Sequence, residues 1–267
     1  MLNSSDPFQT KEILRTMRSA LLLLLLLATL VPKAAAAKVK TTEDLLAAMQ
    51  KKHARTWYRT LTFVQKSTTF KPDGTSTSEI WYEALNAPGK LRVDIEPIKD
   101  GNGFMFADGK QYAFKNGRLV NTQERLNPLL VLGFDVYFQP VAESMRQFKQ
   151  LNFDTSKLRE DTWQGRPAYV VGADAGDLRS PRFWIDKKNL YFVRLIEPAG
   201  KNKDKVQEIQ FNKYQKVEGG GWISPEVVVL LDGKRVFLEE YSEIRTRVKL
   251  DDKLFDPQNW TATHWRQ

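Results

Sequence analysis

The chain has 267 residues, a formal net charge of +9 and no cysteine. Without cysteine it has no disulfide, no thiolate nucleophile and no cysteine-based metal site. Its two histidines, His53 and His264, occur in neither an HxH nor an HExxH spacing, which argues against a zinc centre. Basic and acidic residues are interspersed without a long basic run, which argues against a nucleic-acid partner. We therefore expect no metal, no cofactor and no nucleic acid.

A secretory signal peptide is predicted at residues 1–37. Basic residues up to Arg18 precede an apolar run over residues 20–31, which is shorter than the roughly 20 residues that a transmembrane helix needs. Ala35 and Ala37 then supply the small-residue pattern of a cleavage site. The pattern predicts a cleaved signal peptide and export to the periplasm.

Residues 38–267 then form the exported protein, whichever of Met1 and Met17 is the true start. A chain of this length is sufficient for one large all-β domain. Because it has no disulfide, its stability depends on a hydrophobic core, and the length allows a large one. We expect a single domain that acts as a monomer.

The exported part begins with one predicted helix, which an antiparallel meander follows. In "TTEDLLAAMQKKHA", Thr42 is a candidate N-cap, and Leu45, Leu46 and Met49 form an apolar stripe. From Arg55 onward, large apolar residues recur at every second position, as they do in β-strands. Asp-Gly, Asn-Gly and Pro-Gly dipeptides follow at short intervals and favour tight hairpin turns. The pattern predicts a mainly β (α+β) fold of about eleven strands.

A largely apolar segment, residues 124–151, interrupts the meander. Pro128 and Gly133 are suited to begin and end a short helix, and Pro140 to begin a second one. Between residues 126 and 138 nearly every side chain is apolar. Because surface loops rarely carry so much apolar surface, we expect this segment to be buried against the rest of the protein.

The segment "PRFWIDKKNLYFVRLIEP", residues 181–198, predicts a hairpin whose second strand is apolar on both faces. Phe192 and Ile196 point one way, and Tyr191 and Leu195 point the other. One face of an antiparallel strand is usually in water. The pattern therefore indicates a strand that is covered on both sides.

The chain lacks the sequence motifs of common hydrolases and nucleotide-binding enzymes. It has no GxSxG elbow, no SxxK pair and no Walker loop. We interpret Glu239, Glu240 and Glu243 as a solvated face of a basic strand, since adjacent strand residues point in opposite directions. With no positioned general base, we expect no catalytic residue and no enzymatic activity.

Several motifs together resemble the LolA/LolB/LppX superfamily of periplasmic lipoprotein carriers. They are the first helix with "RTWYRTLTFVQK", the strand "APGKLRVDIEP", the turn in "MFADGKQYAF", the apolar insertion, "FWIDKKNLYFVRLIE" and "LDDKLFDP". The resemblance implies an unclosed antiparallel β-barrel with a helical lid over an apolar cavity that holds acyl chains. It also implies that one face of the strand over residues 190–196 meets this cavity or lid, and that the other face meets helices.

The candidate lipid-binding residues are large apolar side chains at alternate strand positions and in the insertion. Phe104, Phe106, Tyr112 and Phe114 share parity within their strands, as one concave face requires. The candidate cavity wall comprises Trp57, Leu61, Phe63, Leu91, Val93, Phe104, Phe106, Tyr112, Phe114, Phe183, Ile185 and Phe192. The candidate lid comprises Leu129, Leu130, Leu132 and Phe134. A filled core is the alternative for each residue, because periodicity indicates burial and does not indicate empty space.

The function that the resemblance implies is a periplasmic carrier of lipoprotein or lipid acyl chains, which moves them toward the outer membrane. Membrane proteins are the implied donor or acceptor. The family's lid-closing arginine before the strand proline is replaced here by Ala87, and Arg92 is expected to point outward. A free lipid is therefore as compatible as a lipoprotein. The alternative is a periplasmic sensor domain that binds a membrane-anchored regulator.

Overall fold

The structure is a computed structural model and describes residues 39–266, so the predicted signal peptide at residues 1–37 lies outside the described residues. Its main sheet consists of β1 (Thr60–Phe70), β2 (Ser76–Asn86), β3 (Lys90–Ile95), β4 (Asn102–Ala107), β5 (Lys110–Lys115), β6 (Arg118–Glu124), β7 (Asp154–Trp163), β8 (Arg166–Gly172), β9 (Arg182–Asp186), β10 (Phe192–Ala199), β11 (Lys205–Asn212), β14 (Glu226–Leu231) and β15 (Lys234–Thr246). A separate ribbon pairs β12 (Gln215–Lys216) with β13 (Trp222–Ile223).

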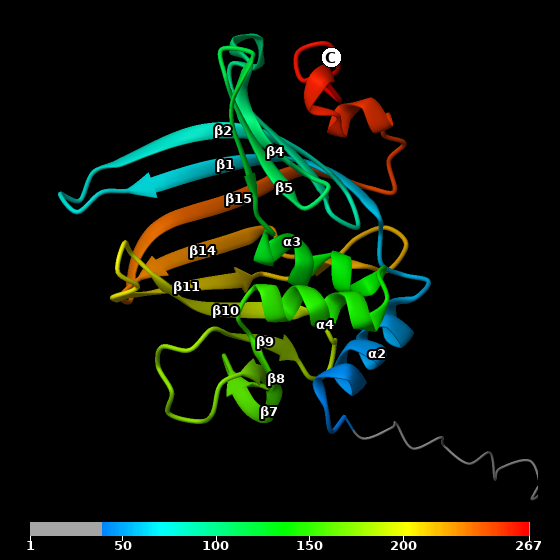
Figure 1. Ribbon diagram of the computed structural model, residues 1–267, viewed down its shortest axis with the longest axis vertical. Coiled ribbons are helices and arrows are strands. Elements are labelled where there is room, and N and C mark those ends of the chain that lie inside the picture. The colour runs from blue at the N-terminus through cyan, green and yellow to red at the C-terminus, as the bar shows by residue number, and fades with distance from the viewer. Residues whose placement is uncertain (1–38, 267) are drawn as a thin grey trace, which may run out of the picture. The chain divides into compact units, whose positions relative to one another are not determined.

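The thirteen strands of the main sheet are antiparallel, and the sheet does not close into a barrel. Their order is β6-β5-β4-β3-β2-β1-β15-β14-β11-β10-β9-β8-β7, so β6 and β7 are the two edges (Figure 1). The predicted mainly β, unclosed architecture is confirmed. The expected number of about eleven strands is too low, because β6 is exposed along its whole length and β12 and β13 are too short to show alternation.

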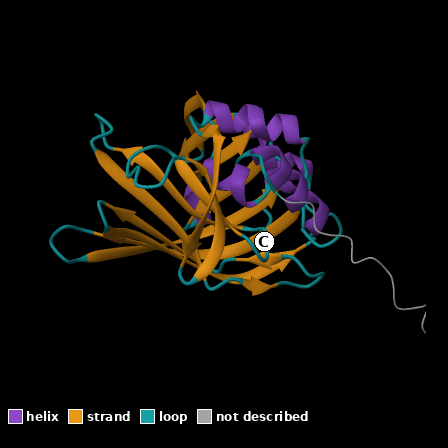
Figure 2. Cartoon of the chain, turned by 90° about the horizontal axis from the view of Figure 1, so that it is seen from below, coloured by secondary structure: helices purple, strands orange, loops and turns teal. Residues whose placement is uncertain are grey.

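Among residues 39–266 the helices are α2 (Thr42–His53), α3 (Pro128–Gly133) and α4 (Val141–Gln150), with the 3-10 turns η1 (Ile98–Asp100), η2 (Asp135–Tyr137), η3 (Asp252–Phe255) and η4 (Pro257–Asn259). The two short helices of the apolar insertion are confirmed: α3 begins at Pro128 and ends at Gly133, and α4 begins directly after Pro140, as predicted. Figure 2 shows the helices gathered on one side of the curved sheet. We call this side of the sheet the inner face and the opposite side the outer face.

The N-cap of α2 is Thr41. Its Oγ1 accepts a hydrogen bond from Asp44 N, and Asp44 Oδ2 accepts one from Thr41 N, both at 3.1 Å. The predicted cap, Thr42, is wrong by one residue. Thr42 Oγ1 instead donates to the carbonyl oxygen of Thr155 at 2.8 Å, so it attaches the helix to β7.

The helices fill the inner face over β7–β10 with a continuous hydrophobic core. The apolar stripe of α2 lies in this core together with Phe148 of α4 and Phe183 of β9. The ring centroids of Phe148 and Phe183 are 5.0 Å apart. Ile185 and Leu132 belong to the same core, and the side chains leave no room for a water molecule between them. This half of the inner face is therefore solid.

Strand β10 is covered on both faces, as its double apolar pattern predicts. A bulge follows Phe192, and both Phe192 and Leu195 lie on the inner face opposite β9. On the outer face, the Cζ atom of Arg194 lies 4.1 Å from the ring centroid of Trp163 and 4.4 Å from that of Trp184. Aromatic rings and a guanidinium group therefore cover the second face. The expectation of a cavity or lid on one face and helices on the other is therefore wrong for this second face, since the helices and the apolar insertion both lie on the inner face.

The turn Asp108–Gly109 places the aromatic residues of β5 on the opposite face of the sheet from Phe104 and Phe106 of β4. Both turn residues have positive φ, 51° and 73°, as a two-residue hairpin turn requires. With two residues in the turn, residues of opposite parity pair across the strands, so Met105 lies opposite Tyr112. Tyr112 and Phe114 consequently lie on the outer face. The prediction that they share a face with Phe104 is wrong.

The C-terminal segment, residues 251–266, folds back over the outer face of β2–β5 and is red in Figure 1. Phe114 stacks on Trp260 with ring centroids 4.1 Å apart. Arg92 forms two hydrogen bonds to Asp94, at 2.7 and 2.8 Å, and donates a third to the carbonyl oxygen of Trp260 at 2.6 Å. Arg92 does point away from the inner face, but the C-terminal segment buries it to 1% exposure.

Candidate functional site

A cavity of about 120 Å³ lies between α3 and the inner face of β1–β4 and β15. It occupies the half of the inner face that the helices do not fill. Most of its lining residues are apolar or aromatic, and none is basic. They are Trp57, Tyr58, Phe63, Gln65, Trp81, Glu83, Leu85, Leu91, Val93, Phe104, Asn127, Leu129, Leu130, Gly133, Phe134, Phe211, Tyr214, Trp222, Ile223, Ser224, Glu239 and Tyr241.

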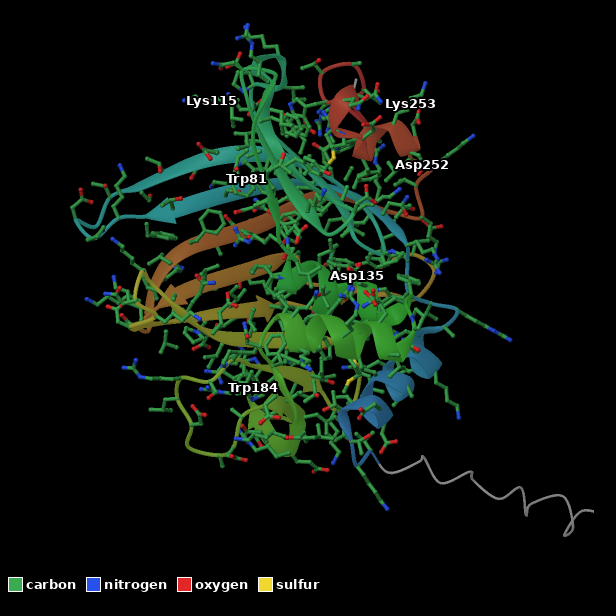
Figure 3. All side chains as sticks on the ribbon, in the orientation of Figure 1. Trp81, Lys115, Asp135, Trp184, Asp252 and Lys253 are labelled. Atoms are coloured by element: carbon green, nitrogen blue, oxygen red, sulfur yellow. The ribbon has the colours of Figure 1, made fainter. Side chains whose placement is uncertain are left out.

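The register of the strands builds the cavity wall. Phe63 of β1 pairs with Glu83 of β2, and Glu83 pairs in turn with Val93 of β3. Val93 then pairs with Phe104 of β4. Because directly paired residues point to the same face, these side chains form one row across the sheet. The ring of Trp81 meets Phe104 edge-on at 5.8 Å, and Figure 3 shows Trp81 on its strand, away from the helices.

The opposite wall is the lid segment, which we define as residues 127–138. Asn127 caps α3, and its Oδ1 accepts hydrogen bonds from Leu129 N at 2.9 Å and Leu130 N at 3.3 Å. Both leucine side chains line the cavity. Gly133 also lines it, and a Cβ atom added there would meet no atom within 4 Å. The lid segment therefore leaves unfilled space at Gly133.

Side-chain hydrogen bonds attach the lid segment on two sides. Asp135 Oδ1 accepts a hydrogen bond from Gly89 N, in the turn between β2 and β3, at 2.9 Å. Burial raises the pKa of Asp135 to about 7, against the opposing effect of this hydrogen bond. On the other side, Gln50 of α2 donates to the carbonyl oxygens of Val136 and Gln139 at 2.9 and 2.8 Å. Figure 3 shows Asp135 among the helices.

Half of the predicted lipid-binding residues line this cavity, namely Trp57, Phe63, Leu91, Val93, Phe104, Leu129, Leu130 and Phe134. Leu61 and Phe106 belong to the adjoining inner-face core without lining it. The filled core under α2 and α4 contains Leu132, Phe183, Ile185 and Phe192. Tyr112 and Phe114 lie under the C-terminal segment. Alternation thus identified burial at these positions but not which part of the sheet is hollow.

Sequence reasoning missed two carboxyl groups in the cavity. Glu83 is only 6% exposed. Its burial, and to a smaller extent repulsion from Glu239, raises its pKa well above the ordinary value. Glu239 accepts a hydrogen bond from Tyr241 Oη at 2.5 Å, and burial raises its pKa to about 7. The interpretation of Glu239 as part of a solvated face is wrong, whereas Glu240 and Glu243 are exposed.

The signal for Glu83 was present in its strand. Glu83 alternates with Trp81 and Leu85, so an acidic residue occupies the apolar side of β2. Gln65 shows the same mismatch on β1. It is 1% exposed, and its Nε2 donates to Ser67 Oγ at 2.8 Å. The cavity therefore combines an apolar wall with a small polar group.

These polar groups are suited to hydrogen bonding with a bound molecule. Within residues 39–266, no group of three or more acidic or histidine side chains is placed to hold a metal ion. In the same part of the chain, no helix is both long enough and apolar enough to cross a bilayer.

Comparison with known proteins identifies the fold. No protein-family model and no curated protein matches the chain. A solved domain from Vibrio parahaemolyticus, assigned to the outer membrane lipoprotein-sorting proteins, is similar with a TM-score of 0.53 and 14% identity, covering 81% of this chain and 97% of that one. A LolA superfamily protein from Nitrosomonas europaea gives 0.52 and 16%, covering 81% and 98%. A DUF1329 family protein from Desulfovibrio piger gives 0.53 and 13%, covering 80% and 95%.

The chain therefore has the fold of the LolA superfamily, as its motifs predict. The match extends over nearly the whole length of each solved domain.

Proposed function

We propose that the protein is a non-enzymatic periplasmic carrier that holds an acyl chain of a lipoprotein or lipid in this cavity and moves it toward the outer membrane. The observation that carries the proposal is the hollow under the lid segment. One half of the inner face is solid, whereas aromatic and aliphatic side chains surround empty space in the other half. A mostly apolar pocket with a few polar groups is the usual form of a small-molecule site. The LolA-type fold supports the same function.

The energetics of such binding require no catalytic group. Each methylene that leaves water for an apolar site contributes about 0.8 kcal/mol. A cavity of about 150 Å³ accommodates a benzene-sized molecule, whereas this one measures about 120 Å³. A whole acyl chain therefore needs the lid segment to move away from β1–β4. We infer that the structure shows the closed form of the lid.

Lipid mass spectrometry of protein purified from the periplasm of its own host tests the proposal. The wild-type protein is expected to carry acyl chains. In Phe104→Asp, a charge enters the apolar wall, so the protein is expected to lose its lipid and stay folded. Leu119→Asp is the matched control, because Leu119 is 51% exposed on the edge strand β6.

Two results would contradict the proposal. The first is a Phe104→Asp protein that retains as much lipid as the wild-type protein. The second is a wild-type protein without acyl chains. If that protein also bound a membrane-anchored regulator tightly, the sensor function would be favoured.

A further inference from the structure

The cavity contains an acidic side chain that the protein itself leaves without a partner. Glu83 lies in the row of paired inner-face residues, between Phe63 and Val93. It is 6% exposed, it lines the cavity, and no hydrogen bond or ion pair joins its carboxyl group to any other side chain among residues 39–266. Buried polar groups in folded proteins almost always have a hydrogen-bond partner. The carboxyl group of Glu83 is therefore available to a molecule bound in the cavity.

The nearby polar side chains have other partners. Glu239 of β15 also lines the cavity, and its pairing position on β1 is four residues from that of Glu83. The Tyr241 hydroxyl donates to Glu239, and Gln65 Nε2 donates to Ser67 Oγ. The tyrosine and glutamine donors are therefore already used. Trp57 Nε1 is the exception, because it belongs to a cavity-lining residue and has no hydrogen-bond partner within the described part of the chain.

No positive charge compensates the two carboxyl groups. None of the cavity-lining residues is basic. The other titratable side chains in the lining are Tyr58, Tyr214 and Tyr241, and burial raises the pKa of each above its ordinary value, so all three are neutral. Glu83 and Glu239 repel each other, since the charge of Glu239 contributes to the raised pKa of Glu83. A positively charged group inside the cavity would remove this repulsion.

We propose that Glu83 and Glu239 select amphiphiles whose polar end is a protonated amine. The inference rests on the proposed function, because the apolar chain of the same molecule occupies the cavity. An ammonium group carries three donors and a positive charge, so it satisfies Glu83 and offsets its repulsion with Glu239. A hydroxyl group offers one donor and no charge. A carboxylate or phosphate adds a further negative charge and is disfavoured.

Three probes with the same alkyl chain test the proposal: dodecylamine, 1-dodecanol and dodecanoate. Their dissociation constants are measured by calorimetry at pH 8, below the concentrations at which they form micelles. The wild-type protein is expected to bind dodecylamine at least about tenfold more tightly than 1-dodecanol, and dodecanoate most weakly. In Glu83→Gln/Glu239→Gln, the preference for the amine is expected to disappear while 1-dodecanol still binds. The control is Glu83→Gln/Glu240→Gln, which removes two carboxylates as well but keeps Glu239 in the cavity. It is expected to retain part of the preference for the amine.

The outcomes separate this inference from the proposed function. If 1-dodecanol binds but the wild-type protein shows no preference for the amine, the inference fails and the carrier function stands. The inference also fails if the Glu83→Gln/Glu239→Gln protein keeps the preference. If none of the three probes binds, both proposals fail. Thermal unfolding of each variant shows whether a lost preference reflects a lost fold.

Discussion

Asp135 of the lid segment accepts a hydrogen bond from the backbone nitrogen of Gly89 at 2.9 Å. The contact joins the lid to the turn between two strands of the cavity wall, β2 and β3. Asp135 is 1% exposed, and its burial raises the pKa to about 7. The folded protein therefore binds a proton at Asp135 more tightly than the unfolded chain does, which makes the stability of the protein dependent on pH.

Asp135→Asn is expected to be more stable than the wild-type protein at pH 8. Because the folded-state pKa is raised, the stabilising contribution of Asp135 is present at low pH and is lost as the pH rises toward about 7. One pH unit of pKa difference corresponds to about 1.4 kcal/mol. The advantage of the variant should therefore shrink by about 2–3 kcal/mol between pH 8 and pH 5.

Urea unfolding at several pH values measures this difference. The control is Asp135→Ala, which removes the acceptor of the Gly89 hydrogen bond and is expected to be less stable than the wild-type protein at pH 5. Parallel pH profiles for the wild-type protein and Asp135→Asn would show that Asp135 does not titrate as described.

Gly133→Phe is expected to fill the cavity and exclude the ligand. Gly133 is the last residue of α3, and a Cβ atom at this position would have open space around it, with no atom within 4 Å. Replacing a helical glycine stabilises by about 0.5–1 kcal/mol, and filling apolar space adds to this. The variant should therefore melt at a higher temperature and carry no acyl chains. Ala142→Phe, on the exposed side of α4, should keep its lipid, and a Gly133→Phe protein with full lipid content would refute the location of the site.

Glu83→Leu is expected to stabilise the protein and to weaken its preference for amines, of which Glu239 keeps a part. Leucine fits the apolar row between Phe63 and Val93 and removes an unpartnered buried carboxyl group. The gain in unfolding free energy should be about 1–3 kcal/mol at pH 8. Chemical denaturation measures it, with exposed Glu240→Leu as a control that should stay within about 0.5 kcal/mol of the wild-type protein. A loss of stability in Glu83→Leu would indicate that Glu83 has a structural partner.

Arg92→Met is expected to destabilise the protein by about 3–5 kcal/mol, because it leaves buried Asp94 without its bidentate partner. Hydrogen bonds from Arg92 hold the pKa of Asp94 below its ordinary value, although burial opposes them. Arg118→Met, at an exposed position on β6, should change stability by less than about 0.5 kcal/mol. Equal unfolding midpoints for the two variants would show that the C-terminal segment does not depend on Arg92.

Local signals were sufficient to predict the helices of the insertion. Pro128, Gly133 and Pro140 act on their own backbone and on the adjacent turn, so α3 begins and ends, and α4 begins, where these residues predict. The facing of Tyr112 was also available from the sequence. A two-residue turn pairs residues of opposite parity, and applying this rule to Asp108–Gly109 places Tyr112 on the outer face.

Other features depend on distant contacts and could not be predicted. Arg92 alternates with apolar neighbours like a solvent-exposed residue. Its hydrogen bonds, however, are accepted by the carbonyl oxygens of Leu254 and Trp260, which lie more than 160 residues later in the chain. Likewise, alternation predicts that both Phe104 and Phe183 are buried. Only the position of the helices determines that Phe183 meets a solid core and Phe104 meets a cavity.

The division of the inner face into a solid half and a hollow half restricts where the molecule can open. The core between α2, α4 and β7–β10 fixes the helices to one half of the sheet. Entry of a guest must therefore widen the gap between α3 and β1–β4, while the other half serves as a rigid base. Amide hydrogen exchange should accordingly be fast in α3 and slow in β8–β10.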